Sequence, residues 1–284
     1  MQYKIQCQLN LHKLYVSLIF IFLAHYHHCI GQKSTPNRIL IIGDSYLYIS
    51  NVDSILSSLC IENGKKVEIH MTSFPGFSIN SHLDVEEINL HDPRKDTIYE
   101  SNPTLLLLSK YNWDQIIIQS DGQPRPNEIQ SEIFDPLRKI RKLTNKKTNL
   151  LLVIPEADPI YPIYKCGYNN MASRLDCFIY NNQEERIDTL NNIYNSRKND
   201  LEYKYILMDK IITIIKKNLN IEIYLDEVGH PNSALAYIIA YTLYAEIFND
   251  YDFSTNLTRR KYSLNQLNKR NKIDSVLKTI YYNE

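Results

Sequence analysis

The sequence predicts an α/β fold in which a mostly parallel sheet of five strands carries helices on both of its faces. One observation predicts this class, and a second predicts the number of domains. From Arg38 onward, short apolar runs alternate with segments whose apolar residues have helical spacing, which is the pattern of repeated βαβ units. The chain also lacks internal repeats and any linker rich in glycine or serine. One domain is therefore expected, over residues 33–284.

Five short segments are predicted to be strands. In order they are 38–42, 66–71, 114–119, 149–154 and 203–209. The first and the fourth, RILII and NLLLVI, are almost continuously apolar, as strands buried on both faces are. The second instead alternates Val67, Ile69 and Met71 with other residues, which is the period of two that a strand shows.

Helices are predicted between and after these strands, from helical spacing and from typical terminal residues. Asn51 is expected to cap a helix that ends just before Gly64, and Asn102 with Pro103 begins another. The other predicted helices are at 129–140, around 171–197, briefly after 209, at 232–248 and at about 263–282, the last packed on the domain. Residues 155–170 contain three prolines and are expected to be irregular.

Composition and motif content exclude some classes of function. Lys and Arg together number 32, as do Asp and Glu, so the formal net charge is zero and nothing favours nucleic acid as a partner. The spacings CxxC and HExxH are absent, and so is the phosphate-binding GxxxxGK[ST] loop. No metal or cofactor is therefore expected.

The first 32 residues are predicted to be a secretory signal peptide. Basic residues precede an apolar run from Leu14 to Ala24, which falls short of the ~20 residues that a membrane-spanning helix needs. The polar segment after it offers a cleavage region near Gln32. The protein is therefore expected to be secreted or periplasmic, without stable membrane insertion after cleavage. An uncleaved membrane anchor is the alternative.

Cleavage near residue 32 would leave three cysteines, Cys60, Cys166 and Cys177. Export permits disulfide formation. Cys166 and Cys177 lie in one segment and are the expected pair. Cys60 falls on the apolar side of a helix and is expected to be a packed free thiol.

Two polar sites at the ends of predicted core elements carry residues suited to nucleophilic catalysis. The tripeptide GDS, which ends at Ser45, follows the first strand at the carboxyl edge of the sheet, where α/β folds bind their ligands. Near the other end of the chain, YLDEVGHPN places Glu227 three residues before His230 and Asp226 four before it. A serine needs a base to accept its proton, and a carboxylate orients that base. Each site also has an ordinary alternative, a turn for the serine and a surface position near a helix cap for the histidine.

Together these segments resemble the SGNH/GDSL hydrolase superfamily over most of the chain after residue 32. The sequence IIGDSY (41–46) looks like the first block of that family, TSFPGFSI (72–79) is similar to the second, and DEVGHPN followed by an apolar helix looks like the last. The ending LYLDEVGHPNSALAYIIAYTLYAEIF especially resembles a poorly characterised subgroup of exported bacterial members.

The resemblance implies a three-layer α/β/α, flavodoxin-like fold and the hydrolysis of esters. It implies that Ser45 is the nucleophile, His230 the base and Glu227 the acid that orients the base. The backbone N–H groups of Ser45 and Gly76 would bind the oxyanion of the tetrahedral intermediate. The implied protein is a secreted serine esterase for short acyl groups, such as acetyl on a carbohydrate, and its partner is a small-molecule or glycan ester.

The sequence departs from the family pattern at two points. The third block normally reads Gly-x-Asn-Asp and supplies an asparagine amide to the oxyanion, whereas here the strand runs into IIIQSDGQPR. Gln119 is favoured over Gln123 as the replacement, with a strand-end glutamine that binds backbone as the alternative. The acid at the catalytic spacing is Glu227 rather than aspartate. The altered third block motivates a second hypothesis, a non-catalytic protein that binds glycan or another surface partner. The retention of Ser45 and His230 argues against it.

Overall fold

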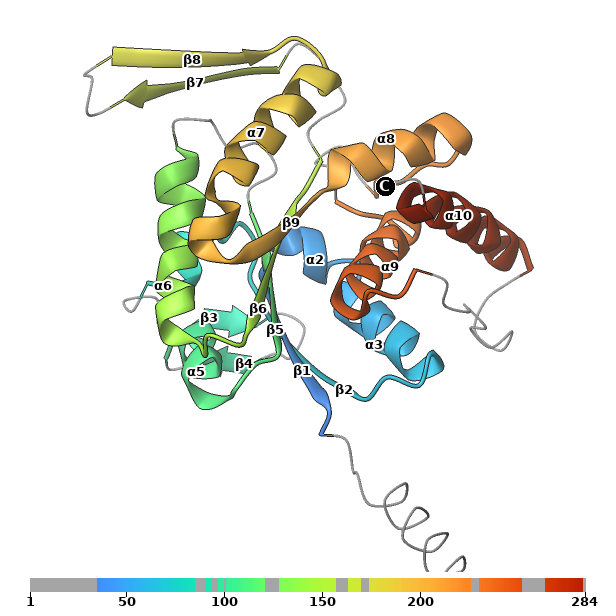
Figure 1. Cartoon of the computed structure of the whole chain (residues 1–284), viewed down its shortest axis with the longest axis horizontal. Coiled ribbons are helices and arrows are strands. Elements are labelled where there is room, and N and C mark those ends of the chain that lie inside the picture. The colour runs from blue at the N-terminus through green and yellow to red at the C-terminus, as the bar shows by residue number, and fades with distance from the viewer. Residues whose placement is uncertain are drawn as a thin grey trace, which may run out of the picture. The chain divides into compact units, whose positions relative to one another are not determined.

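A parallel sheet of five strands runs through the unit Asn37–Glu284 in the computed structural model (Figure 1). The strands are β1 (Asn37–Gly43), β2 (Val67–Ser73), β5 (Gln115–Gln119), β6 (Asn149–Ile154) and β9 (Tyr203–Leu207). Their order in the sheet is β2-β1-β5-β6-β9, and all neighbouring pairs are parallel. This is the strand order of flavodoxin-like folds. The predicted α/β class and five-stranded parallel sheet are confirmed.

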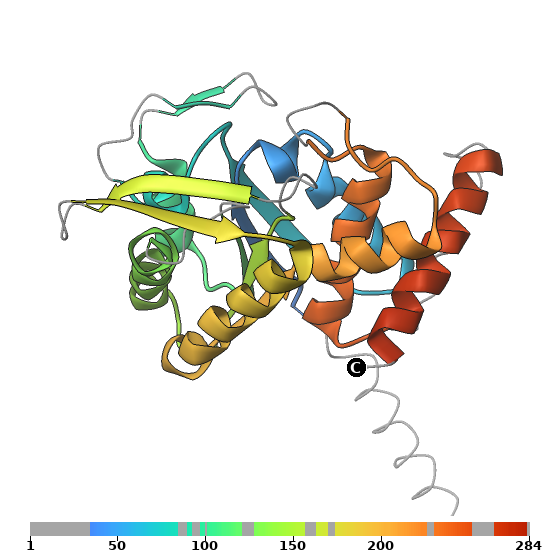
Figure 2. The ribbon, with the colours of Figure 1, turned by 90° about the horizontal axis from the view of Figure 1, so that it is seen from above.

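The structure describes residues 35–84, 90–92, 97–99, 101–120, 128–156, 163–169, 174–225, 230–251 and 264–282. Within them, helices lie on both faces of the sheet (Figure 1 and Figure 2). One face is covered by α3 (Val52–Glu62), α8 (Met208–Asn218), α9 (Ser233–Phe248) and α10 (Leu264–Tyr282). The opposite face is covered by α4 (Ile79–His82), α5 (Pro103–Lys110), the π-helix η1 (Gln130–Phe134), α6 (Asp135–Leu143) and α7 (Gln183–Leu201). The three-layer α/β/α arrangement is thus confirmed.

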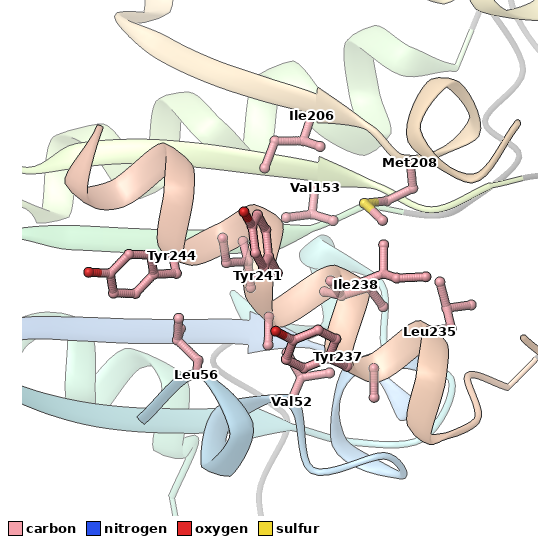
Figure 3. Packing of buried hydrophobic residues seen from close by; sticks show 14 of the residues in the cluster. Val52, Leu56, Val153, Ile206, Met208, Leu235, Tyr237, Ile238, Tyr241 and Tyr244 are labelled. Carbon is pink, nitrogen blue, oxygen red and sulfur yellow. The ribbon is translucent and has the colours of Figure 1, made fainter. Parts of the chain in front are cut away.

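Two apolar cores, one on each face of the sheet, hold the layers together. Ile39 and Ile41 of β1 belong to the core that contains α9, and Leu40 and Ile42 belong to the other, because successive side chains of a strand leave on opposite faces. Helix α9 is buried at every position of 235–245, as a helix that is apolar on all sides must be. Figure 3 shows its side chains packed between those of α3 and those of β6 and β9. No helix among the described residues is both long and apolar enough to cross a membrane.

The helix beginnings follow the predicted polar residues with one exception. Asn102 caps α5, since its side-chain oxygen accepts hydrogen bonds from the backbone N–H groups of Thr104 and Leu105, and Pro103 is the first helical residue. Asn51 precedes α3, but its side chain makes no capping bond. The predicted cap at Asn51 is wrong, because this residue has a φ of +55° and a capping side chain needs an extended backbone.

Two small antiparallel sheets accompany the central one. They pair β3 (Leu90–Asp92) with β4 (Thr97–Tyr99), and β7 (Ile163–Asn169) with β8 (Arg174–Tyr180). The prediction of an irregular segment at 155–170 and of a helix from about 171 is therefore wrong, and α7 begins only at Gln183. The three prolines all precede Ile163, and the residues that follow are rich in aromatic and β-branched side chains, which favour strands.

The hairpin of β7 and β8 bears on the expected disulfide. Cys166 and Cys177 stand directly opposite each other in its ladder. Opposite residues of antiparallel strands have Cα separations within the range that a disulfide spans, so the register supports this pair, which stays a prediction. Cys60 is buried and free, as predicted. Burial raises the pKa of its thiol to about 12, although Lys65 opposes the shift.

Candidate active site

Ser45 lies where the first strand passes into a helix. β1 ends at Gly43, Asp44 occupies the N-cap, and the short helix α2 (Ser45–Tyr48) begins with the serine. The strand order of the sheet reverses beside β1, and ligands of doubly wound sheets bind at the carboxyl edge of that reversal. A Cβ atom at position 43 would lie 2.8 Å from Oε1 of Gln119, so a larger residue there would displace the side chain of Gln119.

His230, from the far end of the chain, lies beside this serine. Its Nε2 is 3.1 Å from Oγ of Ser45. The carbonyl oxygen of His230 accepts a hydrogen bond from the backbone N–H of Leu225 at 2.7 Å. Two residues further on, Asn232 caps the buried helix α9 with its side-chain oxygen. The ring is therefore attached to a well-anchored element, at a distance from which it can accept the serine proton.

The carboxylate that would orient this histidine is not placed. Glu227, its neighbour Asp226 and the alternative amide residue Gln123 lie outside the described residues, so their roles stay predictions. The hydrogen-bonded residues Leu225 and His230 flank both acids in the chain.

Gly76, the second predicted oxyanion donor, lies in the turn that follows β2. Its φ is +70°, a conformation that residues with a Cβ atom rarely adopt. β2 is the neighbour of β1, and Ser73 at its end pairs with Gly43 in the ladder. The turn of Gly76 therefore leaves the sheet at the same edge as Ser45.

Gln119, the third predicted donor, is the last residue of β5 and binds the residue before the nucleophile. Its Oε1 accepts from the backbone N–H of Asp44 at 3.2 Å, and its Nε2 donates to Oδ1 of the same residue at 2.6 Å. The carboxylate of Asp44 also accepts from the backbone N–H of Tyr46 at 2.8 Å. An amide nitrogen carries two hydrogens, and the bond to Asp44 uses one of them.

Two groups that hold the nucleophile turn, which we define as Gly43, Asp44 and Ser45, were missed in the sequence. Oγ of Ser73 donates to the carbonyl oxygen of Asp44 at 2.7 Å. His82 contacts the carbonyl oxygen of Gly43 through Nε2 at 2.8 Å. Ser73 lies within the segment TSFPGFSI and could have been suspected there. His82 is distant from the turn in the sequence and contacts it only in the folded structure, so no local pattern indicates this contact.

Tyr46, the residue after the nucleophile, is bonded to the end of another strand. Its hydroxyl donates to Oε2 of Glu156, which follows β6. Burial raises the pKa of both groups, and the nearby carboxylate of Glu156 raises that of Tyr46 further. The bond joins α2 to a strand two places away from β1 in the sheet. Neither residue belongs to a pattern in the sequence that indicates this contact.

These groups form a hydroxyl–imidazole pair at the edge of the sheet from which the turn of Gly76 also leaves. Such a pair can pass a proton from the serine to the histidine as the serine attacks an electrophilic carbon. Among the residues that the structure describes, no group of three or more His, Cys, Asp or Glu is arranged to hold a metal ion.

Known proteins resemble this chain in structure but do not match it in sequence. No family model and no curated protein matches the chain. A DUF4886 family protein from Bacteroides uniformis has a similar structure, with a TM-score of 0.60 at 14% identity over 87% of this chain and 95% of that chain. At this identity the likeness shows a shared fold alone.

Two other solved structures are more distant. The periplasmic domain of a lipopolysaccharide acetyltransferase from Salmonella Paratyphi A has a TM-score of 0.44 at 11% identity, over 77% of this chain and 85% of that chain. A variant of an acetyl xylan esterase from Geobacillus stearothermophilus has a TM-score of 0.43 at 13% identity, over 74% and 94%. Scores this low carry no argument about function.

Proposed function

We propose that this protein is an exported serine esterase of the SGNH/GDSL type, which hydrolyses short acyl esters such as acetyl groups on carbohydrate. The observation that carries the proposal is the pair of Ser45 Oγ and His230 Nε2, 3.1 Å apart, at the carboxyl edge of a flavodoxin-like sheet. A serine hydroxyl is a weak nucleophile without a base at this distance.

The proposed reaction has two halves. Oγ of Ser45 attacks the ester carbonyl while Nε2 of His230 takes the hydroxyl proton, and the histidine then gives this proton to the leaving alcohol. Water attacks the resulting acyl-serine with the histidine again as base, and the proton returns to Oγ as the carboxylic acid leaves. Glu227 is the proposed acid that holds the imidazole in the required tautomer and stabilises its cation.

Three N–H groups are proposed to bind the oxyanion. Ser45 is the first residue of α2, so its backbone N–H has no acceptor within the helix. Gly76 offers a backbone N–H from the neighbouring turn, and Gln119 offers the amide hydrogen that Asp44 does not use. Donors fixed in advance around a developing negative charge are worth ~10²–10³ each in turnover.

The proposal is tested with a fluorophosphonate probe and a panel of aryl and sugar acetates, applied to the purified protein. We expect covalent labelling at Ser45 and hydrolysis of at least one acetate. Ser54→Ala, which changes an exposed serine of α3, is the matched control and should leave labelling unchanged. Absence of both labelling and hydrolysis would reject the esterase.

A non-catalytic protein that binds glycan is the second candidate. One observation favours it. The third block has no asparagine, and both polar atoms of the Gln119 side chain, the predicted replacement, are hydrogen-bonded to Asp44. Glycan binding by a protein that takes up no probe would support it.

Export and the disulfide are proposed together from the sequence and the hairpin register. Mass spectrometry of the protein recovered outside the cytoplasm is expected to show an N-terminus near residue 33 and a Cys166–Cys177 bond. The bond should stabilise the fold by ~2–3 kcal/mol through the small loop that it closes. A membrane-bound chain that retains residues 1–32 would favour the anchor, and two free thiols would exclude the disulfide.

A further inference from the structure

One buried histidine beside the nucleophile turn has no part in the proposed proton transfers. His82 ends α4, and only 1% of its surface is exposed. Its Nε2 lies 2.8 Å from the carbonyl oxygen of Gly43, and its Nδ1 lies 2.8 Å from Oγ1 of Thr104. Gly43 is two residues before Ser45, so the ring acts on the backbone that presents the nucleophile.

The hydrogen-bond partners of the His82 ring determine which of its nitrogens carries a hydrogen. A carbonyl oxygen only accepts hydrogen bonds, so Nε2 of His82 carries a hydrogen and donates it to Gly43. Burial lowers the pKa of the ring to about 4, with the Gly43 carbonyl opposing the shift, so the ring is neutral at pH 7. Nδ1 therefore accepts from the hydroxyl of Thr104. That oxygen lies 2.8 Å from Oγ1 of Thr72, which is left to donate to it.

The same ring packs on the turn that carries the second oxyanion donor. We call Phe74–Phe77 the oxyanion turn, since Gly76 lies within it. The ring centroids of Phe74 and Phe77 lie 5.8 Å and 5.3 Å from that of His82, and 5.1 Å from each other. The backbone N–H of Phe74 is a second donor to the Gly43 carbonyl, at the longer distance of 3.3 Å. His82 thus touches both turns at once.

We infer that His82 is a positioning residue, whose hydrogen bond to Gly43 and packing on the oxyanion turn set the distance between the N–H groups of Ser45 and Gly76. The inference rests on the proposed function, in which these two groups bind the oxyanion. A displacement of ~1 Å in such groups can lower turnover ~10²-fold. The effect belongs to the transition state, so it should fall on kcat and leave KM nearly unchanged.

The test compares His82→Met with His82→Gln, using p-nitrophenyl acetate as the substrate. Glutamine can place an amide N–H near the position of Nε2, whereas methionine has similar length and no donor. We expect His82→Met to lower kcat by about 10- to 100-fold with KM changed less than about threefold, and His82→Gln to stay within about fivefold of the wild type. His70→Gln is the control, because His70 on β2 is partly exposed and bonds to Glu68; it should leave kcat unchanged.

A second pair of variants covers the case in which His82→Met does not fold. Thr104→Val keeps the shape of the threonine but removes the hydroxyl that donates to Nδ1 and holds the ring in place, and Thr104→Ser retains a hydroxyl. We expect the valine variant to lose roughly 3- to 10-fold in kcat and the serine variant to match the wild type. Nitrogen NMR of the His82 ring should show the neutral Nε2–H tautomer in both proteins, because the Gly43 carbonyl is unchanged, with the Nδ1 signal shifted in Thr104→Val by the loss of its hydrogen bond.

The outcomes separate this inference from the proposed function. An active wild type whose kcat is indifferent to His82→Met, or to Thr104→Val where the former fails to fold, overturns the positioning role alone. Equal losses in His82→Met and His82→Gln would show that the ring only fills space, and a change confined to KM would contradict an effect on the transition state. A wild type that neither reacts with the fluorophosphonate nor hydrolyses an ester rejects the function and this role together.

Discussion

Replacing Ser45 by alanine is expected to lower the turnover of every ester substrate by ~10⁴ or more, with little change in melting temperature. The two effects separate because the hydroxyl of Ser45 contacts His230, while the backbone of the turn is held by other groups, namely Gln119, Ser73 and His82. Steady-state hydrolysis of acetyl esters and thermal unfolding of the purified variant measure them.

Ser54→Ala serves here as well, since it removes a hydroxyl of the same kind from an exposed position of α3. It should match the wild type in both measurements. Near-normal turnover of every ester by Ser45→Ala would reduce Ser45 to a turn residue. A large fall in melting temperature would instead point to a structural role for its hydroxyl.

The second large effect is expected from Glu227→Gln, which should lower turnover at neutral pH by ~10⁴, as the loss of the orienting carboxylate does in serine hydrolases. Glu227 has the three-residue spacing to His230 that the resembling family uses. Without its charge, the imidazole has no partner to fix its tautomer and to stabilise the cation that forms when it accepts a proton.

Asp226→Asn is the matched control, because it makes the same change of carboxylate to amide at the adjacent position. The side chains of adjacent residues point in different directions, so both cannot reach Nδ1 of His230. Asp226 is expected to accept hydrogen bonds from the loop backbone, and its loss should cost ~1 kcal/mol of stability with turnover retained. An inactive Asp226→Asn beside a normal Glu227→Gln would reverse the assignment.

Periodicity and apolar runs were enough to predict the central sheet and most of its helices, because the burial pattern of a strand or helix is visible within its own short segment. The hairpin of β7 and β8 was not predicted, since the prolines at 155–162 suggested irregular structure beyond the point where they end. The Asn51 cap failed because the type of residue at a helix start does not determine its backbone conformation.

The residues of the site also fall into those that local motifs predicted and those that only the fold brings in. Ser45 and His230 were identified in the sequence through motifs that span only a few residues each, and the structure brings their side chains together. The bond of Gln119 to Asp44 was anticipated only as a general alternative, a glutamine that binds backbone. His82 and Glu156 had no signal, because each acts on the turn or its neighbour through contacts between separate elements.

The burial of helix α9 leads to an expectation about how the protein loses activity on heating. The segment that carries His230 runs directly into this helix, and Ser45 follows a strand whose side chains Ile39 and Ile41 share its core. Partial opening at an end or a surface loop away from residues 230–232 leaves that core closed, so it does not separate the base from the nucleophile. The free energy that keeps the two together is then close to that of global unfolding, and activity and tertiary structure should vanish along one common melting curve.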